Sequence, residues 1–253
     1  MASSSLQLGA HVGQQNLTMN EMRALWRHLD AKGMDWISAW DHLYEAPYKG
    51  GTEPHFEAVA TLAALACETT NARLGCLVFY VGYRNPGLLA RAAVTIDHLS
   101  GGRFELGLGA GWHEWEAEAF GYDFPGVGAR LSMLEEATGL ITSLIDNDRT
   151  DYEGTYYRAV DASLLPKPVN NHLPLWIGGV GEKRTLRLAA EKADGWNAAY
   201  ITPEEFGRLN RVLDQWCHDL GRDPAEIERS VNLLFNLGLD ASSARRVGEA
   251  FDA

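Results

Sequence analysis

Two Asp-His pairs stand in the sequence, each followed by leucine: Asp41-His42 in "DWISAWDHLYE" and Asp97-His98 in "TIDHLSGGRFE". A histidine titrates near neutral pH, so it can accept or donate a proton during a reaction, and a carboxylate can orient it. Either pair could equally be ordinary structure, because the tripeptide alone does not distinguish the two roles. The position of each pair on its strand or helix therefore has to indicate whether its role is catalytic or structural.

A second candidate is the glycine-rich segment of "LPLWIGGVGEKRT", which joins an apolar run to a helical pattern. Glycine lets a ligand approach the backbone closely, and the N-terminus of a helix favours negative charge. Lys183 and Arg184 add positive charge there. The alternative is a tight turn between a strand and a helix. We predict that this segment binds a phosphate group through Gly178, Gly179, Val180 and Gly181.

The segment "GLGAGWHEWE" is also rich in glycine, but it lacks the G-x-G-x-x-G spacing of a dinucleotide-binding turn. Its small residues, Ala110 and Gly111, would let a planar ring lie against the backbone. His113 and Glu114 follow and are candidates for contact with that ring. The alternative is a turn that opens a helix with favourably placed glutamates.

Short apolar runs that alternate with helical patterns predict the elements that position these residues. We expect strands at 6–12, 35–40, 72–81, 102–109, 173–179, 194–200 and 228–239. We expect helices at 18–33, 54–70, 85–100, 129–146, 182–193, 202–221 and from 241 onward, with a loop-like insertion at 147–172.

Strict alternation of strands and helices predicts an α/β fold with a parallel sheet, either doubly wound or closed. The length and the regular repeat favour one domain over 1–253, a (β/α)8 TIM-type barrel with an insertion between strands four and five. We find no eighth strand, so we expect a C-terminally incomplete barrel with seven visible strands.

The active site of such a barrel lies at the C-terminal ends of its strands. Asp41-His42 ends a strand there, whereas Asp97-His98 ends a helix on the opposite face, so the second pair is interpreted as structural. The predicted rim also carries His11 and no nucleophile with its base, which suits a flat cofactor better than acyl transfer. Aromatic side chains are predicted to form the wall of the substrate pocket: Trp40, Tyr80 and Trp112.

Composition excludes several classes of function. A net charge of −12 should repel nucleic acid and anionic membranes, and no run reaches the ~20 apolar residues of a membrane helix. The N-terminus lacks the pattern of a secretory signal. The three cysteines, Cys67, Cys76 and Cys217, are far apart and include no C-x-x-C, which predicts no disulfide frame and no metal site. We expect a cytoplasmic protein.

Three segments together resemble the bacterial luciferase-like barrel oxidoreductases, over about residues 6–240. They are "WDHL", "YRNPGLLARAAVTIDHLSGGRFELGLGAGWHEWEAEAFGYDFP" and "LPLWIGGVGEKRTLRLAAEKADGWN". The chain looks closest to the branch that uses coenzyme F420. The resemblance implies hydride transfer between F420 and an unknown small organic substrate, in a homodimer. The alternatives are an FMN-dependent monooxygenase and a cofactor-binding protein without turnover.

The same resemblance implies roles for single residues. Asp41 would touch the cofactor, His42 would be the catalytic acid or base, and the cofactor phosphate would lie near Gly178–Gly181. A non-proline cis peptide would bulge behind the ring, near Leu77–Val78 or Val78–Phe79. Trp112 departs from the family's sugar-phosphate dehydrogenases, which have a glutamate there, and His113 stands where many relatives have asparagine. Sugar-phosphate chemistry therefore does not carry over directly.

Overall fold

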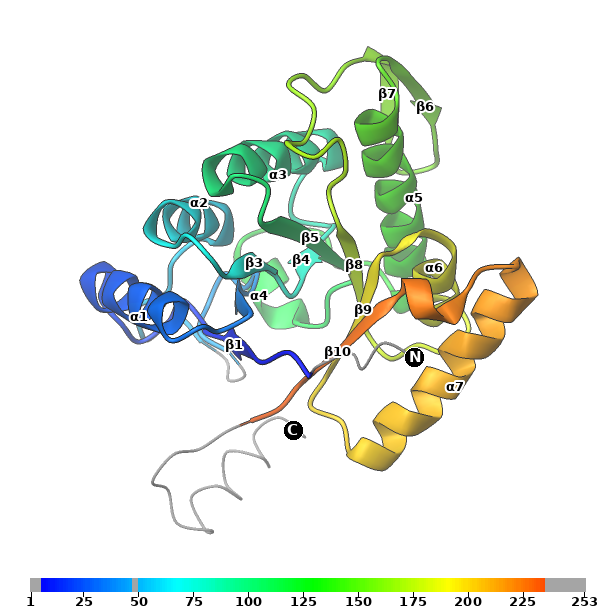
Figure 1. Ribbon diagram of the computed structural model, residues 1–253. Helices are drawn as coiled ribbons and strands as arrows, with labels where there is room; N and C mark the ends of the chain where they lie inside the picture. Colours follow the sequence, from blue (N-terminus) through cyan, green and yellow to red (C-terminus); the bar gives the residue numbers. More distant parts are fainter. Residues whose placement is uncertain (1–5, 47–49, 235–253) are drawn as a thin grey trace.

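The computed structural model describes residues 6–46 and 50–234, and these form a curved parallel sheet covered by helices (Figure 1). The strands run in the order β1-β2-β3-β5-β8-β9-β10, every neighbouring pair is parallel, and β4 pairs with β5 as a continuation of β3. Their bounds are β1 Gly9–His11, β2 Trp36–Ala39, β3 Arg73–Cys76, β4 Phe79–Tyr80, β5 Phe104–Gly109, β8 Leu175–Gly178, β9 Gly195–Ala199 and β10 Glu228–Asn232. The barrel-type fold with seven strand positions is confirmed for the described residues.

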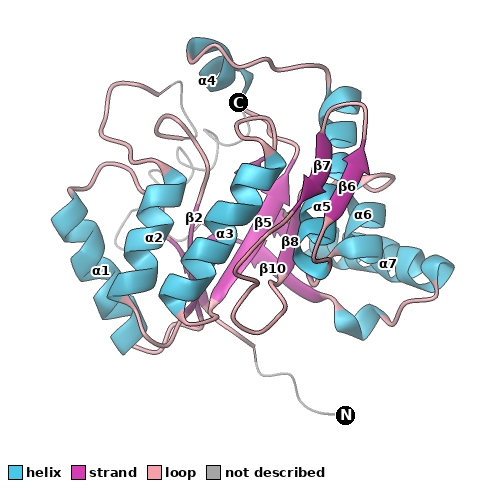
Figure 2. Ribbon diagram, turned by 90° about the horizontal axis from the view of Figure 1, so that it is seen from above, coloured by secondary structure: helices cyan, strands magenta, loops and turns pink. Residues whose placement is uncertain are grey.

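Most of the helices form the outer layer, and the short helix α4 lies at one end of the sheet (Figures 1 and 2). They are α1 Met19–Ala31, α2 Ala58–Glu68, α3 Pro86–Ser100, α4 Glu114–Ala119, α5 Val127–Asp146, α6 Thr185–Lys192 and α7 Pro203–Leu220, with a 3-10 turn at Pro224–Glu226. The predicted helix beyond 241 lies outside the described residues. None of the described helices is both long enough and apolar enough to cross a bilayer.

Helix α1 shows how the sequence builds this outer layer. Thr18 caps its first turn, where the Thr18 hydroxyl accepts from the Glu21 N–H and the Glu21 carboxylate accepts from the Thr18 N–H. This reciprocal capping box satisfies two backbone donors that a helix start leaves free. Met22 and Trp26 lie one turn apart and are fully buried against the sheet. The cap fixes where the helix begins, and the apolar stripe fixes which face it buries.

The third predicted strand is interrupted, which corrects the continuous strand expected at 72–81. β3 ends at Cys76 and β4 begins at Phe79, and the peptide Leu77–Val78 between them is cis, at one of the two expected positions. The Val78 side chain enters the barrel here. A Cβ atom added at Gly109 or Gly178 would collide with it. These two glycines therefore leave room for Val78, whatever else they do.

The insertion expected to be loop-like contains an antiparallel hairpin, β6 Thr150–Glu153 and β7 Arg158–Ala162. Its turn is held by Glu136 of α5, whose carboxylate accepts from the backbone N–H groups of Thr155, Tyr156 and Tyr157. The sequence did not reveal these strands because both are short and mostly exposed, so they lack the apolar alternation that marks a half-buried strand.

Charged side chains join distant strands at the N-terminal end of the sheet. The Arg73 guanidinium at the start of β3 lies 2.9 Å from the Glu105 carboxylate of β5 and 2.7 Å from the Glu228 carboxylate at the start of β10. The indole of Trp176 donates to Glu105 at 2.5 Å and packs edge-on against Trp36. Since β3 and β10 are not neighbours in the sheet, these contacts show that it curves back on itself.

Candidate functional site

Aromatic rings surround His42, which follows β2 at the C-terminal end of the sheet. The imidazole lies 5.2 Å from the Trp112 ring, 5.8 Å from the His113 ring and 6.1 Å from the Trp40 ring, measured between centroids. The His42 side chain is 14% exposed, so part of it reaches solvent. Four of the predicted site residues therefore lie together at the end of β2 and in the loop after β5: Trp40, His42, Trp112 and His113.

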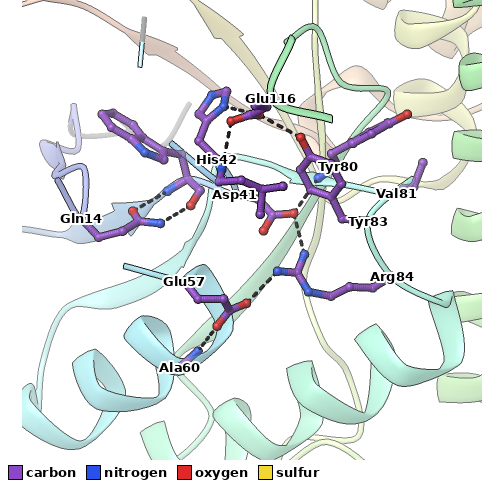
Figure 3. A network of polar contacts seen from close by, with 12 residues as sticks. Gln14, Asp41, His42, Glu57, Ala60, Tyr80, Val81, Tyr83, Arg84 and Glu116 are labelled. Carbon is purple, nitrogen blue, oxygen red and sulfur yellow. Dashed lines mark hydrogen bonds and ion pairs between the residues drawn. The ribbon is translucent and has the colours of Figure 1, made fainter. Parts of the chain in front are cut away.

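A buried carboxylate holds His42 in place (Figure 3). Nδ1 of His42 lies 2.7 Å from Oε1 of Glu116, which sits on α4 and is 3% exposed. The Tyr83 hydroxyl donates to the same oxygen at 2.9 Å, and the Leu43 N–H donates to Oε2 at 2.9 Å. Burial alone would raise the pKa of Glu116, but these hydrogen bonds, led by that from His42, hold it below its usual value. Glu116 is therefore an ionised acceptor at neutral pH.

The ionised carboxylate determines which ring nitrogen of His42 carries the proton. A carboxylate only accepts hydrogen bonds, so Nδ1 must be the donor and neutral His42 must be protonated there. Nε2 has no hydrogen-bond partner among the described residues and keeps its lone pair. The arrangement thus leaves one nitrogen able to accept a proton at the C-terminal end of the sheet, which we call the mouth.

Asp41 lies beside His42 and is engaged with other partners. One carboxylate oxygen accepts from the Tyr80 N–H at 3.1 Å and from the Arg84 guanidinium at 2.7 Å, and Arg84 also reaches Glu57 at 2.7 Å. Burial raises the pKa of Asp41 to about 6, although Arg84 opposes the rise. In this structure Asp41 ties the loop after β2 to β4; its expected contact with a cofactor stays a prediction.

Two further histidines lie close to His42. The His11 ring contacts the Ser38 hydroxyl at 2.8 Å, and burial lowers the pKa of His11 to about 4, with His42 as a second cause. His55 accepts a hydrogen bond from the Trp40 indole at 3.1 Å, and burial lowers its pKa to about 4 as well. Both are neutral near pH 7, so neither competes with His42 for a proton there.

The loop after β5 is built around Tyr80. Gly111 has φ +72°, and a Cβ atom there would collide with the Tyr80 ring, which also packs against Tyr83 and Phe124. In Figure 3 this ring points away from His42. The Arg130 side chain fixes the loop by donating to the Ala110 carbonyl at 3.0 Å. Tyr80 is predicted to line the substrate pocket. In the structure its side chain is buried and packs against the loop at Gly111.

The glycine turn after β8 is exposed, as a phosphate site must be. Gly179, Val180 and Gly181 face solvent at the start of α6. Arg184 does not add charge to this turn, which corrects the sequence expectation. Its guanidinium pairs with the Glu135 carboxylate of α5 and donates to the Gly128 carbonyl. Of the two predicted cations, Lys183 is the one left exposed there.

The second Asp-His pair lies at the end of α3, at the opposite end of the sheet. The His98 ring contacts the Lys167 carbonyl at 2.8 Å, and the Asp97 carboxylate accepts from the Val169 N–H at 2.8 Å. Both bonds hold the segment that returns from the hairpin to β8. This placement agrees with the structural role predicted from the sequence.

Sequence reasoning missed Glu116 and Tyr83. The only available signal for Glu116 was its place in the acidic run after β5, where the prediction had selected Glu114. Glu114 is exposed, whereas Glu116 is two residues further on the helix and faces inward. Two residues along a helix correspond to about 200° of rotation, so neighbours of the same type face opposite sides.

Comparison with known proteins identifies the family. Residues 2–251 match the family model described as luciferase-like monooxygenase. The chain belongs to this family. An F420-dependent glucose-6-phosphate dehydrogenase from Microbacterium testaceum is 30% identical over 246 residues, which cover 94% of this chain and 70% of that one.

Two solved structures share this luciferase-like fold. An F420-dependent secondary alcohol dehydrogenase, in complex with an F420-acetone adduct, superposes with a TM-score of 0.81 at 21% identity, covering 89% of this chain and 68% of that one. A riboflavin lyase solved with modified FMN and riboflavin has a TM-score of 0.79 at 17% identity, covering 98% and 66%. At these identities the likeness establishes the fold alone.

Proposed function

We propose that the protein is an oxidoreductase that transfers a hydride between coenzyme F420 and the carbinol carbon of a small alcohol. The observation that carries this proposal is the His42–Glu116 pair, which leaves one imidazole nitrogen without a hydrogen-bond partner among the residues that the structure describes. The F420-dependent relative, which spans most of the chain, supports the choice of cofactor.

The described residues fit such a cofactor. The exposed turn at Gly179–Gly181 is followed by the exposed Lys183 and by the N-terminus of α6, so it can receive a phosphate group. Ala110 and Gly111 present a loop without bulky side chains beside His42's aromatic neighbours. When bound, the deazaflavin ring would supply the carbon that accepts or returns the hydride.

In the direction of alcohol oxidation, Nε2 of His42 takes the proton of the substrate hydroxyl, and the hydride of the adjacent C–H bond would pass to the bound cofactor. The C–O single bond becomes a carbonyl, so one proton and one hydride leave the alcohol. Glu116 stabilises the imidazolium that forms and keeps Nδ1 protonated throughout. His42 then releases its proton to solvent, to which its side chain is partly exposed.

The decisive experiment is a titration of the purified protein with F420 and, separately, with FMN, following ring fluorescence. Tight binding of F420 and weak binding of FMN is expected. The reverse order would favour the FMN-dependent monooxygenase instead, and binding of neither would favour a protein without turnover.

A His42→Ala variant should then lose turnover and largely keep its affinity for F420. His98→Ala is the matched control, because it alters the same tripeptide at the opposite end of the sheet. Unchanged turnover in His42→Ala would remove His42 from the mechanism.

A further inference from the structure

Two arginines near His42, Arg84 and Arg130, are already engaged with other partners. The Arg84 guanidinium lies between the carboxylates of Asp41 and Glu57, at 2.7 Å from each, and is 16% exposed. Arg130 lies over the Phe124 ring at 3.9 Å and donates to backbone carbonyls. An anionic substrate beside His42 could therefore gain a counter-charge from Arg84 or Arg130 only by displacing an existing partner.

Ionised carboxylates dominate the same region. Glu116 lies in hydrogen-bond contact with His42, and Glu45, three residues after His42 in the chain, is a second buried carboxylate that acts electrostatically on His55. Four hydrogen bonds to Glu45, from Gly51, Thr52 and Glu53, hold its pKa near 2 in spite of burial. Like charges at short range repel, more strongly where water is excluded. A phosphate group close to His42 is disfavoured by this arrangement.

What the mouth does offer is aromatic surface. Trp112 is 60% exposed although it is a large apolar side chain, and its ring stands edge-on to His42 and tilted against His113. The Trp40 ring also packs edge-on against the His42 ring. The Trp40 indole donates a hydrogen bond to His55, and the Gln14 side-chain amide bonds both the carbonyl and the N–H of the Trp40 backbone. Indole rings are favoured surfaces for stacking and apolar contact.

We infer that the substrate is an uncharged alcohol with an apolar, preferably aromatic, body, and that Trp112 is the residue that selects it. This inference rests on the proposed function for its reacting group. The alcohol hydroxyl meets Nε2 of His42, and the body of the substrate covers the exposed face of Trp112. Burial of apolar surface favours binding, so an aromatic body gains affinity against the Trp112 ring and a sugar phosphate does not.

The test compares 1-phenylethanol with glucose 6-phosphate in the presence of F420, followed by loss of deazaflavin absorbance. We expect kcat/KM for 1-phenylethanol to exceed that for glucose 6-phosphate by at least about tenfold, which is about 1.4 kcal/mol. Trp112→Ala should lower kcat/KM for 1-phenylethanol about tenfold or more, and Trp112→Phe should retain most of it. Tyr156→Ala, which removes an exposed aromatic side chain of the β6–β7 hairpin, is the control.

A second measurement separates this inference from the proposed function. Acetophenone, the ketone product, is titrated into the protein with and without F420, and binding is followed by quenching of tryptophan fluorescence. Saturable quenching that Trp112→Ala abolishes and Tyr156→Ala retains supports the inference even if F420 does not bind. Preference for glucose 6-phosphate, or acetophenone binding that Trp112→Ala leaves unchanged, overturns it.

Discussion

Replacing Glu116 by glutamine tests whether this carboxylate positions His42. The carboxylate receives three short hydrogen bonds on two oxygens, from His42 and Tyr83 on Oε1 and from the Leu43 N–H on Oε2. Glutamine has one oxygen and one NH2 group, so in either orientation its NH2 faces a donor. The change in shape is small, and the change in hydrogen bonding is large.

The magnitude follows from these bonds. A buried donor without an acceptor costs about 1–3 kcal/mol, so we expect Glu116→Gln to lower the free energy of unfolding by about 3 kcal/mol. That loss leaves a typical domain folded. For turnover, the amide NH2 facing His42 would favour a proton on Nε2, the tautomer that cannot accept one. We expect kcat to fall about 100-fold, equivalent to about 2.7 kcal/mol.

The assay measures kcat, KM and their dependence on pH for Glu116→Gln, with Tyr83→Phe as the control. Tyr83→Phe removes one donor to Glu116 and keeps the bond to His42, so its kcat should change less than tenfold. In Glu116→Gln the loss should appear in kcat while KM changes little, because the substitution alters the tautomer of His42 and leaves the substrate surface unchanged. Equal effects of the two substitutions on kcat, or a loss that appears in KM alone, would refute the positioning role.

Three further outcomes are expected. His98→Ala removes the contact with the Lys167 carbonyl and should cost about 1 kcal/mol of unfolding free energy without changing turnover; a large loss of kcat would contradict the structural assignment. Burial lowers the pKa of His11 to about 4 from 6.5, so between these values the unfolded chain binds the extra proton and His11 makes stability rise with pH. In His11→Gln, the difference in unfolding free energy between pH 5 and pH 6, measured with urea, should shrink by about 1.2 kcal/mol, and an unchanged difference would show that His11 titrates normally. Thr18→Ala removes the cap of α1 and should lower the free energy of unfolding by about 1 kcal/mol while F420 affinity stays constant; reduced affinity would show that α1 reaches the site.

Sequence patterns predicted the seven strand positions well because parallel strands buried on both faces are continuous apolar runs. They located Asp41-His42 at a strand end for the same reason. The β6–β7 hairpin was not predicted because its strands are mostly exposed. Its turn is held by the Glu136 carboxylate, and this contact cannot be read from the local sequence.

The candidate site was only partly predictable. His42, Trp40, Trp112 and His113 follow their strands directly, so the order of elements was enough to group them. Glu116 acts on His42 only because α4 turns it inward, and nothing local distinguishes it from Glu114. The pairing of Arg184 with Glu135 likewise depends on how α5 packs beside α6, which local sequence does not specify.

The contact of Val78 with Gly109 and Gly178 has a consequence for how this sequence can change over generations. Because one side chain occupies the space that a methyl group at either glycine would need, the three positions form a single epistatic unit. An alanine at 109 or 178 is accessible only after residue 78 has become smaller, so the order of substitutions matters. Double-mutant cycles across these positions should be strongly non-additive.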